Sequence, residues 1–161
     1  MTQRFRAAAL GLALVAGLGL SACSNDKDLA DASAFGAGAA TPGSAQDFVV
    51  NIGDRVFFES DSTDLTPTAT ATLDKQAAWL QRYPRYTFII EGHADERGTR
   101  EYNLALGERL AKAAADFLIA QGISPNRIRT ISYGKERPDA LGSDEPSYAA
   151  NRRAVSIVVR S

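Results

Sequence analysis

The 161-residue chain contains a single cysteine and a single histidine, so it lacks the residues for an intrachain disulfide or a histidine-based zinc site. It also lacks an excess of positive charge, because 18 basic and 19 acidic residues give a net charge of −1 at pH 7. This balance argues against nucleic-acid binding, which needs a basic surface to neutralise phosphates. The length suits one globular domain, and the stability of that domain must come from its hydrophobic core.

The N-terminus has the pattern of a secretory signal peptide. Arg4 and Arg6 precede an unbroken run of Ala, Leu, Gly and Val over residues 7–20. As a helix this run would be about 21 Å long, too short for a hydrocarbon core of about 30 Å. The alternative is a buried core helix, which the glycines and the missing polar face disfavour. We therefore expect residues 1–22 to be a signal peptide.

The only cysteine stands directly after this run, in Leu20-Ser21-Ala22-Cys23. The four residues resemble the bacterial lipobox. The resemblance implies attachment of diacylglycerol to the thiol of Cys23, cleavage before it and N-acylation of the new amine. Several acyl chains anchor a protein where one chain holds only marginally. Ser24 at the next position implies export to the outer membrane, with the chain on its periplasmic face.

Residues 23–46 of the mature chain read as a lipidated flexible tether. Small and polar residues dominate, and such a segment cannot bury enough apolar area to offset its ordering entropy. A tether of this length averages about 25–30 Å from end to end and stretches to about 75–80 Å. Loss of the signal peptide leaves 16 basic and 19 acidic residues, a net charge of about −3. The globular domain is expected at residues 47–161.

Within that domain, short apolar runs alternate with helical patterns. Thr66-Pro67 can cap and start a helix that ends before Pro84, and Gly122 can end a second helix over residues 101–121. The apolar stripe expected on the second helix consists of Tyr102, Leu106, Leu110, Ala113 or Ala114, and Phe117. Strands are expected at residues 56–58, 86–91, 128–133 and 153–160, and residues 92–98 and 138–146 as loops. The pattern predicts a two-layer α/β sandwich, with helices packed on one β-sheet.

The densest polar stretch, residues 91–103, joins the second strand to the second helix. A helix N-terminus offers unpaired N–H groups that suit a carboxylate, although a solvated charged loop is the simpler interpretation. His93, Asp95 and Glu96 could suggest acid–base catalysis. However, the chain has no Gly-x-Ser-x-Gly motif, no second histidine and no spare cysteine, so catalysis is disfavoured. His93 is interpreted as a polar wall residue or a hydrogen-bonded structural histidine.

Four separated motifs carry a resemblance to a known family. They are Gly-His-Ala-Asp-Glu-Arg-Gly-Thr at 92–99, Glu-Tyr-Asn-Leu-Ala-Leu-Gly-Glu-Arg at 101–109, Ser-Tyr-Gly-Lys-Glu-Arg-Pro at 132–138 and Asn-Arg-Arg-Ala-Val at 151–155. In this order they resemble the peptidoglycan-associated lipoproteins of the Tol-Pal system, whose domain is OmpA-like. The resemblance covers about residues 54–160, and it implies helices on one mixed β-sheet.

The resemblance implies noncovalent binding of peptidoglycan through the meso-diaminopimelate of its stem peptide. This side chain ends in an ammonium and a carboxylate on one carbon, so its site needs an anion, a cation and backbone donors. By resemblance, Asp95 takes the ammonium, residues around Ser60 and Asp61 close the pocket, and an arginine of the following helix takes the carboxylate. Asn103 is interpreted as a brace between loop and helix.

The sequence departs from the family at that arginine, because Leu110 stands at its position and Arg109 precedes it. Adjacent helix positions are about 100° apart, so Arg109 cannot simply replace the missing group. One hypothesis is a weakened affinity, in which case Leu110→Arg should tighten binding at least tenfold. The other is that Arg97, Arg100 or Arg109 supplies the cation, in which case Arg109→Ala should abolish binding and Leu110→Ala should mainly lower stability.

The function implied is that of a non-enzymatic outer-membrane lipoprotein that ties the membrane to the cell wall, maintains the envelope and supports constriction at division. The resemblance adds TolB and TolA as partners, and it implies no cofactor beyond the lipid on Cys23. The alternatives are a periplasmic enzyme acting on peptidoglycan and, because of Leu110, a module with weakened wall binding that acts mainly through protein partners.

Overall fold

The computed structural model describes residues 40–160 of the chain. The predicted signal peptide, Cys23 and most of the predicted tether lie outside the described residues. Across residues 40–160, every helix is too short or too polar to span a bilayer.

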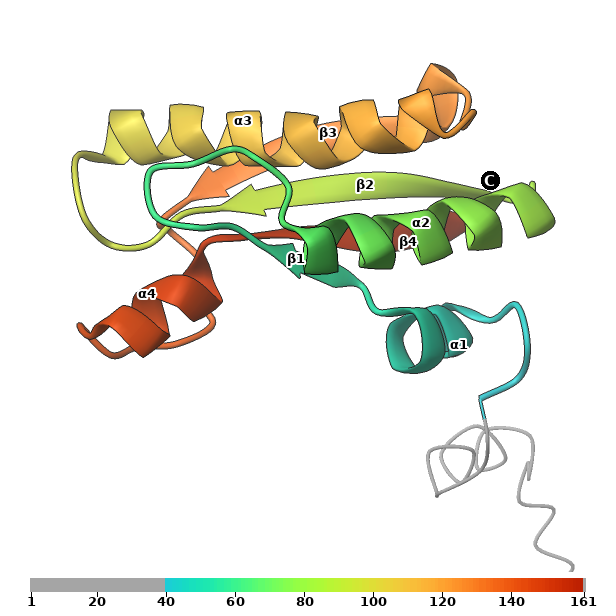
Figure 1. Ribbon diagram of the computed structural model, residues 1–161, viewed down its shortest axis with the longest axis horizontal. Helices are drawn as coiled ribbons and strands as arrows, with labels where there is room; N and C mark the ends of the chain where they lie inside the picture. Colours follow the sequence, from blue (N-terminus) through green and yellow to red (C-terminus); the bar gives the residue numbers. More distant parts are fainter. Residues whose placement is uncertain (1–39, 161) are drawn as a thin grey trace, which may run out of the picture. The chain divides into compact units, whose positions relative to one another are not determined.

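One mixed sheet of four strands forms the centre of the domain. The strands are β1 (Arg55–Phe57), β2 (Tyr86–His93), β3 (Ile128–Gly134) and β4 (Arg153–Arg160), in the order β1-β4-β2-β3. β2 runs parallel to β3 and antiparallel to β4, and β4 is also antiparallel to β1. The expected central position of the second strand is confirmed, because β2 lies between two neighbours (Figure 1).

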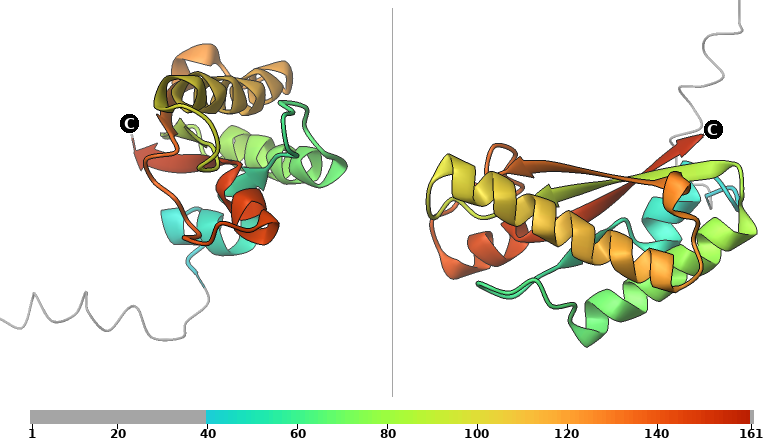
Figure 2. Two further views of the ribbon diagram at one scale, coloured as in Figure 1. Left: turned by 90° about the vertical axis from the view of Figure 1, so that its left-hand side faces the viewer. Right: turned by 90° about the horizontal axis from the view of Figure 1, so that it is seen from above.

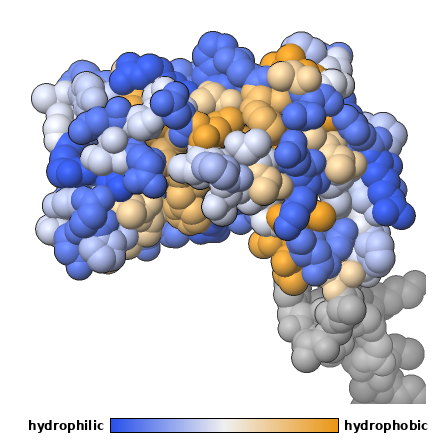
Figure 3. All heavy atoms as spheres, viewed as in Figure 1, coloured by the Kyte–Doolittle hydropathy of each residue, from blue (hydrophilic) through white to orange (hydrophobic). Residues whose placement is uncertain are grey.

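Two long helices cover the sheet and complete the expected two-layer α/β fold. They are α2 (Pro67–Arg82) and α3 (Arg100–Ala120), and α3 connects the parallel strands β2 and β3 (Figure 2). The core between the layers contains Leu73 and Leu80 of α2, Phe88 and Ile90 of β2, and Leu110 of α3. From the side shown in Figure 1, hydrophobic atoms reach the surface mainly toward the middle, and hydrophilic atoms dominate the end that carries α4 (Figure 3).

The predicted helix signals are confirmed. The Thr66 hydroxyl accepts a hydrogen bond from the Ala69 amide at 3.1 Å, with Pro67 in the first turn. Gly122 ends α3 with a φ of 94°, and its amide donates to the Ile119 carbonyl. The Thr99 hydroxyl caps the start of α3 by accepting from the Tyr102 amide at 3.1 Å.

Three features differ from the expectation. The expected stripe of α3 is confirmed at Leu110 and Ala114 but not at Tyr102, which is exposed. Small and polar residues complete the buried face and let the helix lie close to the sheet: Asn103, Gly107, Ala111 and Ala115, with Leu118. A short helix, α4 (Glu145–Asn151), begins at the end of the expected loop and has no apolar stripe that would reveal it. Residues 125–127 form a 3₁₀ turn before β3.

The expected boundary between tether and domain at residue 46 lies inside a folded segment. Ser44 caps the short helix α1 (Ala45–Asp47), and a π-helical turn follows at Phe48–Ile52. The Gly43 carbonyl accepts from the Tyr86 hydroxyl at 3.0 Å, and the buried Phe48 ring packs 5.0 Å from the rings of Trp79 and Phe88. Residues 43–48 therefore belong to the domain, which the small residues of this stretch conceal in the sequence.

Helix α3 touches strand β2 at a pair of glycines. A Cβ atom added at Gly92 would overlap the Gly107 carbonyl, and one added at Gly107 would overlap the Ser132 hydroxyl and the Gly92 carbonyl. The two backbones therefore lie too close for any side chain at either position. This contact fixes where the first turns of α3 lie relative to the end of β2.

We predict that Gly107→Ala destabilises the protein by about 2 kcal/mol, because overpacking outweighs the gain of about 1 kcal/mol in helix propensity. Urea unfolding measures the change. Ala105→Gly, at an exposed position of the same helix, is the control and should cost only about 1 kcal/mol, from propensity alone. A more stable Gly107→Ala variant would contradict the close contact.

His93 is buried at the end of β2, with 2% of its surface exposed. Its ring stacks on Tyr133 at 5.7 Å, and Nε2 lies 3.4 Å from Glu91 Oε2. Burial, followed by the positive charges of Arg153 and Arg137, lowers the pKa of His93 from 6.5 to about 4. The His93 imidazole therefore binds a proton less readily in the folded state than in the unfolded state. The contribution of neutral His93 to the free energy of unfolding is complete above pH 6.5 and is lost as the pH falls toward 4.

We predict that the wild-type protein loses about 2 kcal/mol of unfolding free energy between pH 7.5 and pH 5 because of His93. His93→Phe keeps a ring over Tyr133 and cannot take the proton, so it should lack this loss. Urea unfolding of both proteins at the two pH values measures the difference. Equal losses in the two proteins would show that His93 does not carry the acid sensitivity.

Candidate functional site

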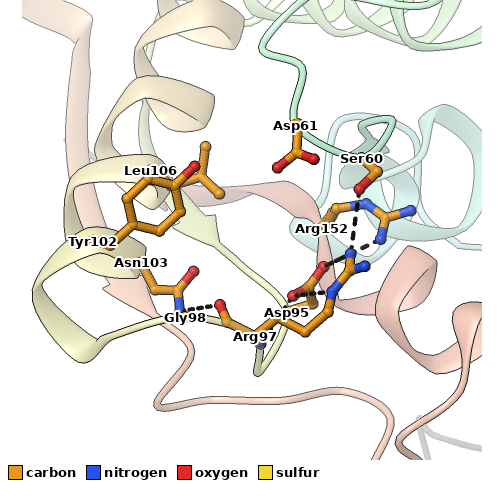
Figure 4. A pocket seen from close by; sticks show the side chains of 9 residues that line it. All are labelled: Ser60, Asp61, Asp95, Arg97, Gly98, Tyr102, Asn103, Leu106 and Arg152. Carbon is orange, nitrogen blue, oxygen red and sulfur yellow. Dashed lines mark hydrogen bonds and ion pairs between the residues drawn. The ribbon is translucent and has the colours of Figure 1, made fainter.

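A cavity of about 290 Å³ opens where β2 ends and α3 begins. Its lining comes from the loop after β1, the loop after β2, the first turns of α3 and the residue after α4 (Figure 4). The lining residues are Ser60, Asp61, Asp95, Arg97, Gly98, Tyr102, Asn103, Leu106 and Arg152. Charged groups of both signs therefore meet in one space, beside the apolar side chain of Leu106.

Asp95 is the buried anion of the cavity. Its carboxylate accepts hydrogen bonds from the Arg97 amide at 3.1 Å, from the Arg97 guanidinium at 3.1 and 2.6 Å, and from Arg152 Nη1 at 3.2 Å. Burial raises the pKa of Asp95, but the hydrogen bonds from Arg97 and Arg152 outweigh it and hold the pKa below its usual value. Asp95 is therefore ionised at neutral pH.

Arg152 is the buried cation, with 4% of its surface exposed. Besides Asp95, its guanidinium donates to the Phe58 carbonyl at 3.2 Å and to Glu145 Oε1 at 2.7 Å. These contacts join the end of β1, the loop after β2 and helix α4. Three segments that are distant in sequence thus depend on one guanidinium for their relative positions.

Arg97 is the second cation, and its side chain is about half exposed. Its guanidinium lies 4.5 Å from the centre of the Tyr148 ring and donates to the Ser60 hydroxyl at 3.3 Å. Arg97 Nη1 lies 4.0 Å from Glu145 Oε2. This side chain can therefore offer N–H groups to an anion that enters from solvent.

Asp61 faces the cavity from the loop opposite α3 (Figure 4). Its φ of 53° is unusual for a residue other than glycine, and such strain is common at functional sites. Within residues 40–160, its carboxylate makes no hydrogen bond or ion pair. Asp61 thus brings an uncompensated negative charge to the rim.

The loop after β2 is held from both sides. Buried Asn103 donates through Nδ2 to the Arg97 carbonyl at 2.8 Å. Lys135 Nζ donates to the carbonyls of Glu96 at 3.1 Å and Gly98 at 2.6 Å. Asn103 accordingly sits as a brace between loop and helix, and the loop geometry is set before any ligand arrives.

The structure brings together four residues that the sequence analysis selected: Ser60, Asp61, Asp95 and Asn103. It does not bring the two helix candidates to the cavity. Arg109 is exposed on α3 outside the lining, and Leu110 lies in the core with 1% of its surface exposed. His93 is also outside the lining. In the described part of the chain, no three potential metal-ligating side chains gather.

Four lining residues were not predicted from the sequence, and Arg97 was expected only as an alternative cation; the four are Gly98, Tyr102, Leu106 and Arg152. The available signal was the Asn-Arg-Arg motif at 151–153, whose middle residue is the buried cation. Nothing in the local pattern around residue 152 indicates that it lies beside Asp95, because the two are 57 positions apart.

Comparisons with known proteins agree with these motifs. A family model described as the OmpA family matches residues 57–152. The peptidoglycan-associated lipoprotein of Rhizobium meliloti is 57% identical, over 91% of this chain and 85% of its own. The protein of the same name from Mesorhizobium japonicum is 56% identical, over 90% and 88%.

Among solved structures, the peptidoglycan-associated lipoprotein of Burkholderia pseudomallei is 36% identical and aligns with a TM-score of 0.68, over 72% of this chain and all of its own. Sequence, fold and motif order thus agree. The chain belongs to the OmpA family and, within it, to the peptidoglycan-associated lipoproteins.

Proposed function

We propose that this protein is an outer-membrane lipoprotein that binds peptidoglycan noncovalently and ties the outer membrane to the cell wall. The observation that supports this function best is the pairing of two carboxylates with two guanidiniums around one small cavity: Asp61 and Asp95, Arg97 and Arg152. A site with both charges suits a zwitterion, whose ammonium and carboxylate must be desolvated together and compensated together.

The ligand proposed for the cavity is the meso-diaminopimelate of the peptidoglycan stem peptide. Its ammonium binds between Asp61, whose carboxylate makes no ion pair within residues 40–160, and Asp95. Its carboxylate binds the exposed side of the Arg97 guanidinium, with the Ser60 hydroxyl beside it. Asn103 keeps the loop in place rather than contacting the ligand.

This arrangement explains how the site can function without an arginine at position 110. An unpaired charge in a buried site costs about 3–5 kcal/mol, so a ligand carboxylate needs a cation nearby. Arg97 and Arg152 provide two within the cavity, whereas exposed Arg109 lies outside it. Of the two hypotheses for the cation, we therefore favour a loop arginine, Arg97, supported by Arg152.

We predict that Arg97→Ala weakens binding of a diaminopimelate-containing muropeptide at least tenfold, because the ligand carboxylate loses its exposed cation. Arg109→Ala removes the same charge outside the cavity and should change affinity less than twofold. Calorimetric titration measures both, and circular dichroism checks that each variant folds. Equal losses would contradict the assignment, and a tenfold gain for Leu110→Arg would favour the weakened-affinity hypothesis instead.

Attachment of the protein to the membrane depends on Cys23 in this proposal. We propose that its thiol carries diacylglycerol, that its amine is acylated, and that the chain is anchored on the periplasmic face of the outer membrane. Residues between Cys23 and the folded segment that begins near residue 43 then span the distance to the wall. Many copies confined to one surface hold a polymer by avidity even when each site binds weakly.

We predict that Cys23→Ser abolishes incorporation of labelled palmitate and releases the protein from the membrane fraction, because the chain loses its covalent lipid. Binding of the same variant to purified sacculi should persist. Ser21→Thr, which keeps Cys23 and a small polar side chain before it, is the control. Labelling of the Cys23→Ser variant would contradict the lipid site.

The family membership also supports proposals for partners. TolB is proposed to compete with peptidoglycan for the domain, and TolA to engage the complex during constriction at division. Retention of the protein on TolB but not on purified sacculi would favour the alternative of a module that acts mainly through protein partners.

A further inference from the structure

A groove of about 580 Å³ lies between the first turns of α3 and strand β3. Its lining includes Glu101, Leu104 and Glu108 of the helix, and Thr130, Ile131 and Ser132 of the strand. At 100° per residue, these helix residues lie almost opposite Tyr102, Asn103 and Leu106, which line the cavity. One helix thus separates two concave surfaces.

Within residues 40–160, strand β3 is an edge of the sheet, because its one pairing partner there is β2. Alternate N–H and C=O groups of its seven residues therefore face away from the sheet. Soluble proteins usually protect such an edge with proline, charged side chains such as lysine, or a very short strand. β1, the other edge, has three residues, whereas Ile128–Gly134 contains no proline or lysine, and its one charged residue, Arg129, lies on the face of the sheet away from α3 and its two glutamates. The β3 edge is open to an added strand.

The groove also exposes apolar surface next to this edge. Leu104 is 43% exposed and Ile131 is 38% exposed, although most other leucines and isoleucines of the described domain are buried or partly buried. An extended segment placed along β3 would cover both side chains and pair with the strand. When a peptide adds as a strand to a sheet edge, backbone hydrogen bonds provide the affinity and pockets for alternate side chains provide the specificity.

The charged residues that line the groove indicate which kind of segment it binds. Glu101 and Glu108 are the charged residues of its lining, and both are exposed. Glu108 accepts a hydrogen bond from the Thr130 hydroxyl at 2.9 Å, which holds its carboxylate over the strand. If β3 paired with β3 of a second copy about a two-fold axis, the Glu101 and Glu108 carboxylates of the two copies would lie close together and repel each other. A basic segment would meet complementary charge.

We propose that this groove binds an extended segment of a partner protein in which basic and apolar residues alternate, and that the segment adds as a strand to β3. The basic residues face α3, where they meet Glu101 and Glu108 and lay their alkyl stems on Leu104, and the apolar residues on the opposite face cover Ile131. Because the cavity lies on the other side of α3, a partner can occupy the groove while the cavity is filled. This inference is independent of what the cavity binds.

The test uses the full chain in nonionic detergent and two seven-residue peptides with blocked ends. One alternates lysine with valine, and the other alternates glutamate with valine. The lysine peptide should bind at least tenfold more tightly than the glutamate peptide, and its binding should weaken with salt. It should also slow amide hydrogen exchange in residues 128–134.

The variant Glu101→Lys/Glu108→Lys should reverse the order of the two peptides and keep its binding to sacculi unchanged. Asp74→Lys, which changes an exposed acid on α2, is the matched control and should keep the original order. Equal binding of the peptides, an order that survives the double reversal, or protection away from β3 would overturn the proposal. So would a concentration-dependent dimer that protects β3, because a second copy would then be the occupant.

Discussion

The cluster of Asp95, Arg97 and Arg152 is the interaction on which the rest of the site depends. The Asp95 carboxylate accepts four hydrogen bonds from the two arginines, and Arg152 also reaches Phe58 and Glu145. Removal of one partner from a buried ion pair costs about 3–5 kcal/mol, so the cluster holds the surrounding segments together only while it is complete. It gives the cavity its shape and its two charges at once.

Close packing of the layers brings this cluster and the start of α3 together. Gly92 and Gly107 allow the backbones of β2 and α3 to touch, and Asn103 then reaches the Arg97 carbonyl from the first turn of the helix. The same helix forms one wall of the cavity and one wall of the groove beside β3. A rigid α3 therefore supports two surfaces that face different directions.

The sequence was sufficient for the fold class, the two long helices and the central strand, because caps, prolines and apolar runs are local signals. Thr66, Pro67 and Gly122 act as those signals predict. The predicted stripe of α3 was right at Leu110 and Ala114 and wrong at exposed Tyr102. It also omitted Asn103 and Gly107, because hydrophobicity does not indicate residues that are buried to brace a loop or to allow a close approach. Helix α4 and the folded segment at residues 43–48 depend on contacts with distant residues: Tyr148 of α4 donates to Glu96, and Tyr86 donates to the Gly43 carbonyl.

For the site, the strand end followed by a helix start indicated the polar stretch at residues 91–103, and the family resemblance indicated Asp95, Ser60 and Asp61. The role of Arg152 was not predicted, because it reaches Asp95 from 57 positions away and lies between an expected loop and an expected strand. Because position 110 holds leucine, the sequence left Arg97, Arg100 and Arg109 as candidate cations. Of these three, the cavity lining contains Arg97, and the fold adds Arg152. The family resemblance indicated the motif of the site, and the packed structure shows which arginine side chains lie in the cavity.

The most direct measurement is a crystal structure of the domain with a diaminopimelate-containing muropeptide bound. The account predicts that the diaminopimelate carboxylate contacts the Arg97 guanidinium and that the ammonium lies between Asp61 and Asp95. A ligand carboxylate held by Arg109, or a muropeptide bound away from the Asp95 cavity, would contradict it.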